Sequence, residues 1–92
     1  MKILWSFAAW SDVDRVHSFM ARYELEEANA ILDRLASAPS SLLEFPRRGL
    51  RLSEFDPREV RELRTGRYVM RYELTNDEVR VLRVFHAKQT RA

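Results

Sequence analysis

The clearest pattern in this 92-residue chain is an alternation of apolar and polar residues in its last third. Between residues 68 and 74, tyrosine, methionine and leucine occupy every second position, and the intervening positions are mostly charged. A period of two predicts a β-strand with one buried face. Segments 60–63 and 79–85 are also rich in Val, Leu and Phe, and turn-forming sequences separate the three segments. The stretch from Arg58 to His86 therefore predicts an antiparallel three-stranded meander.

The third strand of this meander differs from the second because its apolar residues do not alternate. Val79 and Val81 point to one face of an ideal strand, whereas Leu82 and Val84 point to the other. A strand that is apolar on both faces is expected to be central in its sheet. The arginines that interrupt it, among them Arg83, are then expected near its ends or over a groove.

Upstream of the meander, apolar residues recur at intervals of three and four, which predicts two amphipathic helices. The first helix is expected from about Ser11 to Tyr23, with Ser11 or Asp12 as its N-cap. The second is expected over residues 25–35, with acidic residues in its first turn and a stop at Ser37-Ala38-Pro39. Because the link between them is so short, the two helices should form an antiparallel hairpin that covers the sheet.

Two further segments complete the predicted fold. The apolar run Lys2–Phe7 predicts an opening strand that pairs with the later sheet. The connector from Pro39 to Pro57 holds too many leucines and phenylalanines for a disordered linker, so an ordered loop with an extended piece near Gly49–Leu52 is expected. The chain is therefore predicted to be one α+β domain over residues 1–92, with an N-terminal strand, a helical hairpin and a three- to four-stranded antiparallel sheet.

The composition excludes several kinds of site. Without cysteine, the chain has no disulfide framework, thiolate metal site or cysteine nucleophile. Its two histidines, His17 and His86, are too few for a metal cluster, and we expect neither a metal nor another cofactor. Met1–Trp10 carries two tryptophans and no clear cleavage site, unlike a signal peptide, and no run approaches the ~18 apolar residues of a membrane span. We therefore expect a cytoplasmic protein with no membrane partner.

Charge is distributed unevenly along the chain. Residues 1–45 hold four Lys/Arg against seven Asp/Glu, a balance of −3, and residues 46–92 hold twelve against seven, a balance of +5. The half that carries the meander is therefore expected either to face an anionic partner, such as nucleic acid or an acidic protein segment, or to present a solvated arginine-rich surface.

Several of these segments together resemble the RelE/ParE toxin superfamily, and most closely its ParE-like, plasmid-stabilisation branch. The opening strand, the aromatic and alanine residues that follow it and the helical hairpin stand in the order of that superfamily. The same holds for the later segments Pro46-Arg47-Arg48-Gly49, Val60-Arg61-Glu62-Leu63, Tyr68–Tyr72 and Val81-Leu82-Arg83-Val84-Phe85-His86. The similarity covers essentially the whole chain.

The resemblance implies the toxin of a type II toxin–antitoxin pair. ParE-like members poison DNA gyrase without nuclease activity, and a ParD-like antitoxin neutralises them in a hetero-oligomer. A contact with DNA is then expected only through the antitoxin. The alternative is a RelE-like messenger-RNA interferase, which cleaves the message in the ribosomal A site.

The two classes differ in the residues that they need. Ribonucleolytic cleavage needs a base for the 2′-hydroxyl, a cation beside the phosphate and an acid for the leaving oxygen. RelE-like members supply these groups partly from a lysine at the position of Glu62 and an arginine at the position of Val69. They also use a second arginine near the C-terminal end, where this chain has Gln89 nearby. A carboxylate and a valine do not stabilise a scissile phosphate, so the resemblance implies a protein without the RelE-type catalytic site.

An altered nuclease site stays open as the alternative, since some nuclease members use a histidine near the end of the last strand. His86, with Arg83, Arg71 or Glu62 nearby, is the candidate here, because imidazole titrates in the useful range. ParE-like sequences commonly carry a histidine there as well, which favours a structural or partner-contacting role. The residues expected to bind antitoxin or target, from charge and position, are Arg64, Arg67, Arg71, Arg83, His86, Lys88 and Arg91.

Overall fold

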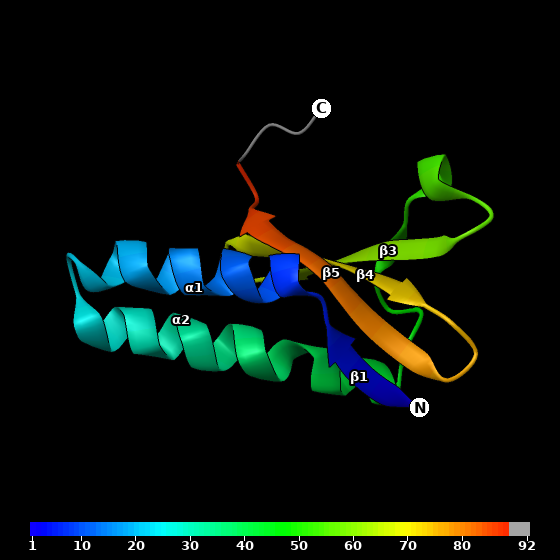
Figure 1. The fold of residues 1–92 in the computed structure, drawn as a ribbon, viewed down its shortest axis with the longest axis horizontal. Coiled ribbons are helices and arrows are strands. Elements are labelled where there is room, and N and C mark those ends of the chain that lie inside the picture. The colour runs from blue at the N-terminus through cyan, green and yellow to red at the C-terminus, as the bar shows by residue number, and fades with distance from the viewer. Residues whose placement is uncertain (89–92) are drawn as a thin grey trace.

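The computed structural model describes residues 1–88, in which two antiparallel helices pack against one face of a five-stranded sheet (Figure 1). The elements follow the predicted order, and the predicted α+β class is confirmed. Their bounds are β1 Lys2–Trp5, α1 Phe7–Ala21, α2 Leu25–Ser37, β2 Leu50–Arg51, β3 Glu59–Thr65, β4 Tyr68–Leu74 and β5 Glu78–His86. Two short 3₁₀ segments, Ala38–Leu43 and Ser53–Phe55, lie in the connector. No helix in this part of the chain has the length and apolar character needed to cross a membrane.

The strand order in the sheet is β1-β5-β4-β3-β2. Strands β2 to β5 pair antiparallel, which confirms the predicted meander and the extended piece near Gly49–Leu52. Strand β1 joins the opposite edge and runs parallel to β5, with Ile3 opposite Val79. As expected for a strand rich in apolar residues, β5 lies inside the sheet, although the middle position belongs to β4.

The alternation predicted for residues 68–74 is present, since Met70, Tyr72 and Leu74 are buried on the side that packs beneath the helices and the connector. Strand β5 points apolar residues to both faces as expected, since Phe85 lies opposite Val69 outside the core cluster and against Arg71, but the face expected for Val84 was wrong. The register between β4 and β5 shifts between Arg71 and Tyr72, so Val81 and Val84 both reach the core beneath the helices. A β-bulge of this kind changes the phase of a strand without interrupting it.

Helix α1 begins four residues before the predicted start. Ser6 is its N-cap: the Ser6 hydroxyl accepts a hydrogen bond from the Ala9 N–H at 3.0 Å and donates one to the Leu82 carbonyl at 2.9 Å. The predicted caps, Ser11 and Asp12, therefore lie inside the helix, and Asp12 is buried. Ser6 is the cap because it directly follows β1, where its hydroxyl also donates to a backbone carbonyl of β5. Ser11 lies inside the helix and cannot reach this carbonyl.

The connector is ordered, as predicted, because a buried tyrosine holds it to the sheet. The Tyr72 hydroxyl accepts a hydrogen bond from the Gly49 N–H at 2.9 Å and donates one to the Pro46 carbonyl at 2.8 Å. Burial raises the pKa of Tyr72, so the phenol keeps the proton that it donates. Helix α2 ends at Ser37 as predicted, and Leu42 of the connector fills a second core cluster beside Tyr72.

Candidate functional site

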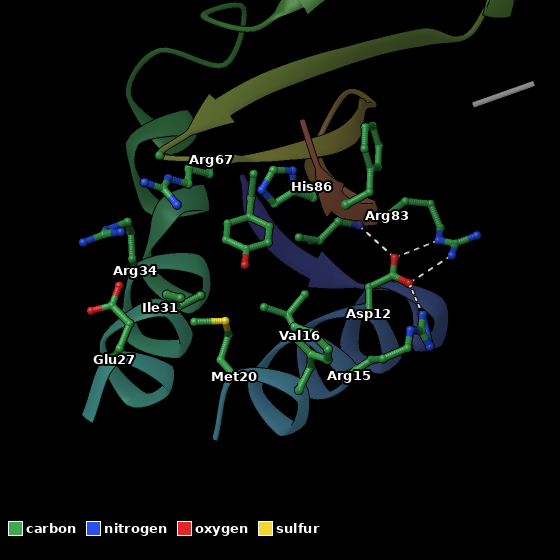
Figure 2. A pocket seen from close by; sticks show the side chains of 15 residues that line it. Asp12, Arg15, Val16, Met20, Glu27, Ile31, Arg34, Arg67, Arg83 and His86 are labelled. Carbon is green, nitrogen blue, oxygen red and sulfur yellow. Dashed lines mark hydrogen bonds and ion pairs between the residues drawn. The ribbon is translucent and has the colours of Figure 1, made fainter. Parts of the chain in front are cut away.

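A groove of about 850 Å³ lies between the helical hairpin, the β3–β4 turn and the end of β5 (Figure 2). Its lining consists of Asp12, Arg15, Val16, Phe19, Met20, Glu27, Ile31, Arg34, Gly66, Arg67, Tyr68, Arg83, Val84, Phe85 and His86.

Helical spacing explains which side chains reach the groove. On α1 the lining residues fall at three- and four-residue intervals from Asp12 to Met20, and on α2 they are Glu27, Ile31 and Arg34. Residues with these intervals share one face of a helix. On the sheet side, Gly66 turns the chain with a φ of +62°, a value that glycine adopts without steric cost. The groove therefore lies where one face of each helix meets the β3–β4 turn and the end of β5.

The floor of the groove is apolar. Val16, Met20 and Tyr68 are half-buried, and all three pack against the core cluster that contains Ile31. The His86 ring meets the Tyr68 ring edge-on, with 5.4 Å between the ring centroids, and its Nδ1 accepts a hydrogen bond from the Lys88 backbone N–H at 3.0 Å. His86 is thus positioned at the groove wall by an aromatic contact and a backbone donor.

Asp12 organises one end of the groove. Its carboxylate accepts hydrogen bonds from Arg83 Nε and Nη2 at 2.8 and 2.9 Å, from the Val84 N–H at 2.9 Å and from Arg15 Nη2 at 2.7 Å. Strand β1 pairs with β5 only as far as Val81, so Asp12 satisfies a β5 backbone donor that has no strand neighbour. Beyond the end of β1, the side chains of Ser6 and Asp12 therefore provide the hydrogen-bond partners for the β5 backbone.

The ionisation of Asp12 follows from these contacts. Burial alone would raise the pKa of this carboxyl, because Asp12 is only 4% exposed. Hydrogen bonds from Arg83, the Val84 N–H and Arg15, together with the charge of Arg83, outweigh burial and hold the pKa below its ordinary value. The same contact raises the pKa of Arg83. Arg83 therefore lies at the groove as a cation that is already paired.

The opposite end of the groove carries two arginines that, unlike Arg83, are not paired with a carboxylate of residues 1–88. Arg34 projects from α2 and Arg67 follows Gly66 in the β3–β4 turn (Figure 2). Neither guanidinium forms an ion pair with a carboxylate of residues 1–88. In all, four arginines line the groove against two carboxylates, so the groove is cationic as well as apolar.

The structure brings together some of the predicted binding residues and separates others. Arg67, Arg83 and His86 line the groove. Arg64 and Arg71 do not line it, and they lie opposite Val69 and Glu62 in the β3–β4 register. Lys88 is exposed just past the end of β5. Arg91 lies outside the described residues.

The side chains weighed for catalysis do not converge. Arg71 forms an ion pair with Glu62 at 2.8 Å and lies over the rings of Phe55 and Phe85, at 5.1 and 5.7 Å from their centroids. Val69 is buried, and Gln89 lies outside the described residues. Of the residues considered beside His86, only Arg83 shares the groove with it. The described part of the chain contains no group of three His, Asp or Glu side chains that could hold a metal ion.

Sequence reasoning missed Asp12, Arg15, Glu27 and Arg34 as groove residues. A signal existed for Asp12, because it falls in phase with Ala9, Val13 and Val16, where a carboxylate needs a buried partner. Arg15, Glu27 and Arg34 carried no such signal, since each looks like an ordinary solvated residue on a helix.

Comparison with known proteins gives consistent results. The family described as the ParE toxin of the type II toxin–antitoxin system parDE matches residues 3–91. Toxin RelE2 of Caulobacter vibrioides is 29% identical over 86 residues, with 94% of each chain covered. A chain in the structure of the chromosomal ParDE system from P. aeruginosa superimposes with a TM-score of 0.78 at 18% identity, covering 94% of this chain and 95% of that one. This last likeness concerns the fold.

Proposed function

Because this chain belongs to the ParE family of type II toxin–antitoxin toxins, we propose that it inhibits DNA gyrase by binding and that a ParD-like antitoxin neutralises it. The proposed activity involves no bond-making by the toxin itself. It takes place in the cytoplasm, where gyrase acts on DNA.

The observation that carries the proposal is the groove, which suits a protein partner better than it suits a scissile phosphate. Its floor is apolar, its rim is cationic, and only Arg83 accompanies His86 among the catalytic candidates. At the positions where RelE-like members place cations, Glu62 is paired with Arg71 and Val69 is buried. Catalysis of phosphoryl transfer needs positioned cations and an acid–base pair, which this arrangement does not supply.

The groove also suits an antitoxin. An amphipathic helix can bury apolar side chains on Val16, Met20 and Ile31, while its acidic residues meet the arginines. A ligand that binds only the folded toxin also raises its apparent stability, which matters for a domain of this size. We therefore assign Arg67, Arg83 and His86 to the antitoxin-facing surface, and Arg64, Lys88 and Arg91 remain candidates for contact with the target.

Purified toxin tests the proposal directly. Added to DNA gyrase, ATP and relaxed plasmid, it should stop supercoiling and cause gyrase-dependent DNA breaks, because the proposed complex traps gyrase on DNA. Gel electrophoresis of the plasmid measures both effects. Prior mixing with an equimolar amount of antitoxin should restore supercoiling. Supercoiling that continues at toxin concentrations well above that of gyrase would refute the proposed target.

Two observations favour the alternative, a RelE-like interferase: His86, Arg67 and Arg83 line the same groove, and a relative is named RelE2. Primer extension on ribosome-bound message separates the two functions. The proposed gyrase inhibitor leaves the message intact. An interferase cuts it in the A site, and a His86→Ala variant that still folds and still binds antitoxin should then lose the cutting.

A further inference from the structure

The charged side chains of the groove fall into two sets. Arg15 and Arg83 are held by Asp12, whereas Glu27, Arg34 and Arg67 form no ion pair within the described chain. Outside the groove, six further ion pairs engage arginines of residues 1–88. A ligand therefore finds its available charges at one end of the groove.

The two unpaired arginines lie on facing walls. Arg34 Nη1 lies 3.5 Å from the point that a Cβ on Gly66 would occupy, so this guanidinium rests against the turn that carries Arg67. Figure 2 shows Arg34 and Arg67 together at the end of the groove away from Asp12. A carboxylate placed between two cations attracts both, and this attraction offsets their mutual repulsion. The pair is therefore a site for a carboxylate or another anion.

Glu27 gives this site a direction. Glu27, Ile31 and Arg34 stand at i, i+4 and i+7 on α2 and all line the groove. Seven residues of helix span roughly 10 Å, about two turns. Along one wall the groove thus presents an acid, an apolar residue and a base in order. A partner helix lying on this wall would match it with a base, an apolar residue and an acid.

From this arrangement, and resting on the proposed function, we infer that Arg34 and Arg67 clamp one carboxylate of a helical antitoxin segment. The same segment places a basic residue about two turns away, against Glu27, and apolar residues on Val16, Met20 and Ile31. The opposite charges of Glu27 and Arg34, about two turns apart on α2, fix the direction in which the segment lies. A nucleic-acid backbone fits less well, because Glu27 repels phosphate and the apolar floor provides no hydrogen-bond donor or cation for it.

Charge reversal tests the clamp. Arg34→Glu and Arg67→Glu should each weaken binding of the cognate antitoxin by about tenfold or more in isothermal titration calorimetry, because an attraction becomes a repulsion. Glu27→Lys should weaken it less, by about threefold, since one cation contact is lost. Lys2→Glu is the matched control: Lys2 is exposed, forms no ion pair within residues 1–88 and lies on β1, away from the groove, so its reversal should leave the affinity within about twofold. Circular dichroism confirms that each variant folds.

A charge swap makes the test specific. Replacing each acidic residue of the antitoxin segment by lysine in turn should identify one that loses affinity for the wild-type toxin and regains it with Arg67→Glu. Wild-type affinity in both Arg34→Glu and Arg67→Glu would overturn the inference. So would a single-stranded oligonucleotide whose binding falls in these variants while antitoxin affinity holds. The gyrase assay is independent: unchanged supercoiling refutes the proposed target and leaves the clamp standing, whereas a wild-type toxin that binds no antitoxin refutes both.

Discussion

Replacing Asp12 by alanine should lower the free energy of unfolding by about 3 kcal/mol, a large share of the roughly 5–14 kcal/mol that holds a domain of this length together. The carboxylate accepts four hydrogen bonds and is almost fully buried. Its removal leaves the Val84 N–H without a partner at the unprotected edge of β5. Arg83 is 54% exposed and can turn to water, so the orphaned backbone donor and the lost packing account for most of the cost.

Urea unfolding followed by circular dichroism measures this change. Arg15→Ala is the matched control, because Arg15 binds the same carboxylate at 2.7 Å but is 65% exposed; it should cost less than about 0.5 kcal/mol. A loss below 1 kcal/mol in Asp12→Ala would show that water satisfies the β5 edge without Asp12. Asp12→Asn keeps an acceptor for the Val84 N–H, so its loss of unfolding free energy should lie between those of Asp12→Ala and Arg15→Ala.

Replacing Asp12 should also change how the stability of the protein depends on pH. The folded-state pKa of Asp12 lies below its ordinary value, so its ionisation stabilises the fold fully above about pH 4 and less as the pH falls through the lowered pKa. Glu59 and Glu73, whose pKa values are also lowered beside arginines, act in the same direction. Wild-type protein should therefore lose stability on acidification below pH 4 more steeply than Asp12→Asn does.

Gly49→Ala should cost about 3 kcal/mol as well, for a steric reason. A Cβ at this position would lie 2.7 Å from the Glu62 carbonyl oxygen, 2.7 Å from the Tyr72 hydroxyl and 2.8 Å from a Tyr72 ring carbon. The carbonyl belongs to β3 and the tyrosine is completely buried, so neither can move aside cheaply. The displaced backbone would also weaken the bond from the Gly49 N–H to Tyr72.

Thermal unfolding checks this prediction, and the expected loss corresponds to a fall in Tm of roughly 12–24 °C. Gly66→Ala is the control: its Cβ meets nothing closer than 3.5 Å, and its cost of about 1–2 kcal/mol arises from the positive φ alone. Tyr72→Phe removes one of the clashing atoms, so the double variant with Gly49→Ala should lose less than the sum of the single changes. Strict additivity would contradict the proposed clash.

The sequence was enough for the features that depend on local periodicity. Alternation in residues 68–74 identified β4, and the three- and four-residue spacing identified both helices, because these patterns reflect which face of each element is buried. The helix cap was predicted at Ser11 or Asp12 and lies at Ser6, since an apolar residue follows within two positions of either serine. What decides between them is a hydrogen bond from Ser6 to Leu82, 76 residues away, which no local pattern contains.

The groove was predictable only in part, for the same reason. Arg67, Arg83 and His86 were found because they cluster in the basic half of the chain. Arg34 was missed because its importance comes from the place where the β3–β4 turn meets α2, and that depends on how the hairpin crosses the sheet. The paired state of Arg83 was equally hidden, because Asp12 lies 71 residues before it.

The parallel pairing of β1 with β5 has a consequence for biosynthesis. Ile3 leaves the ribosome long before Val79 is made, so the opening strand waits for its neighbour while most of the chain is translated. The final strand also provides three of the four hydrogen bonds that Asp12 accepts, and one wall of the groove. A nascent chain halted before β5 therefore has neither a closed sheet nor a complete groove, and both form only when that strand emerges.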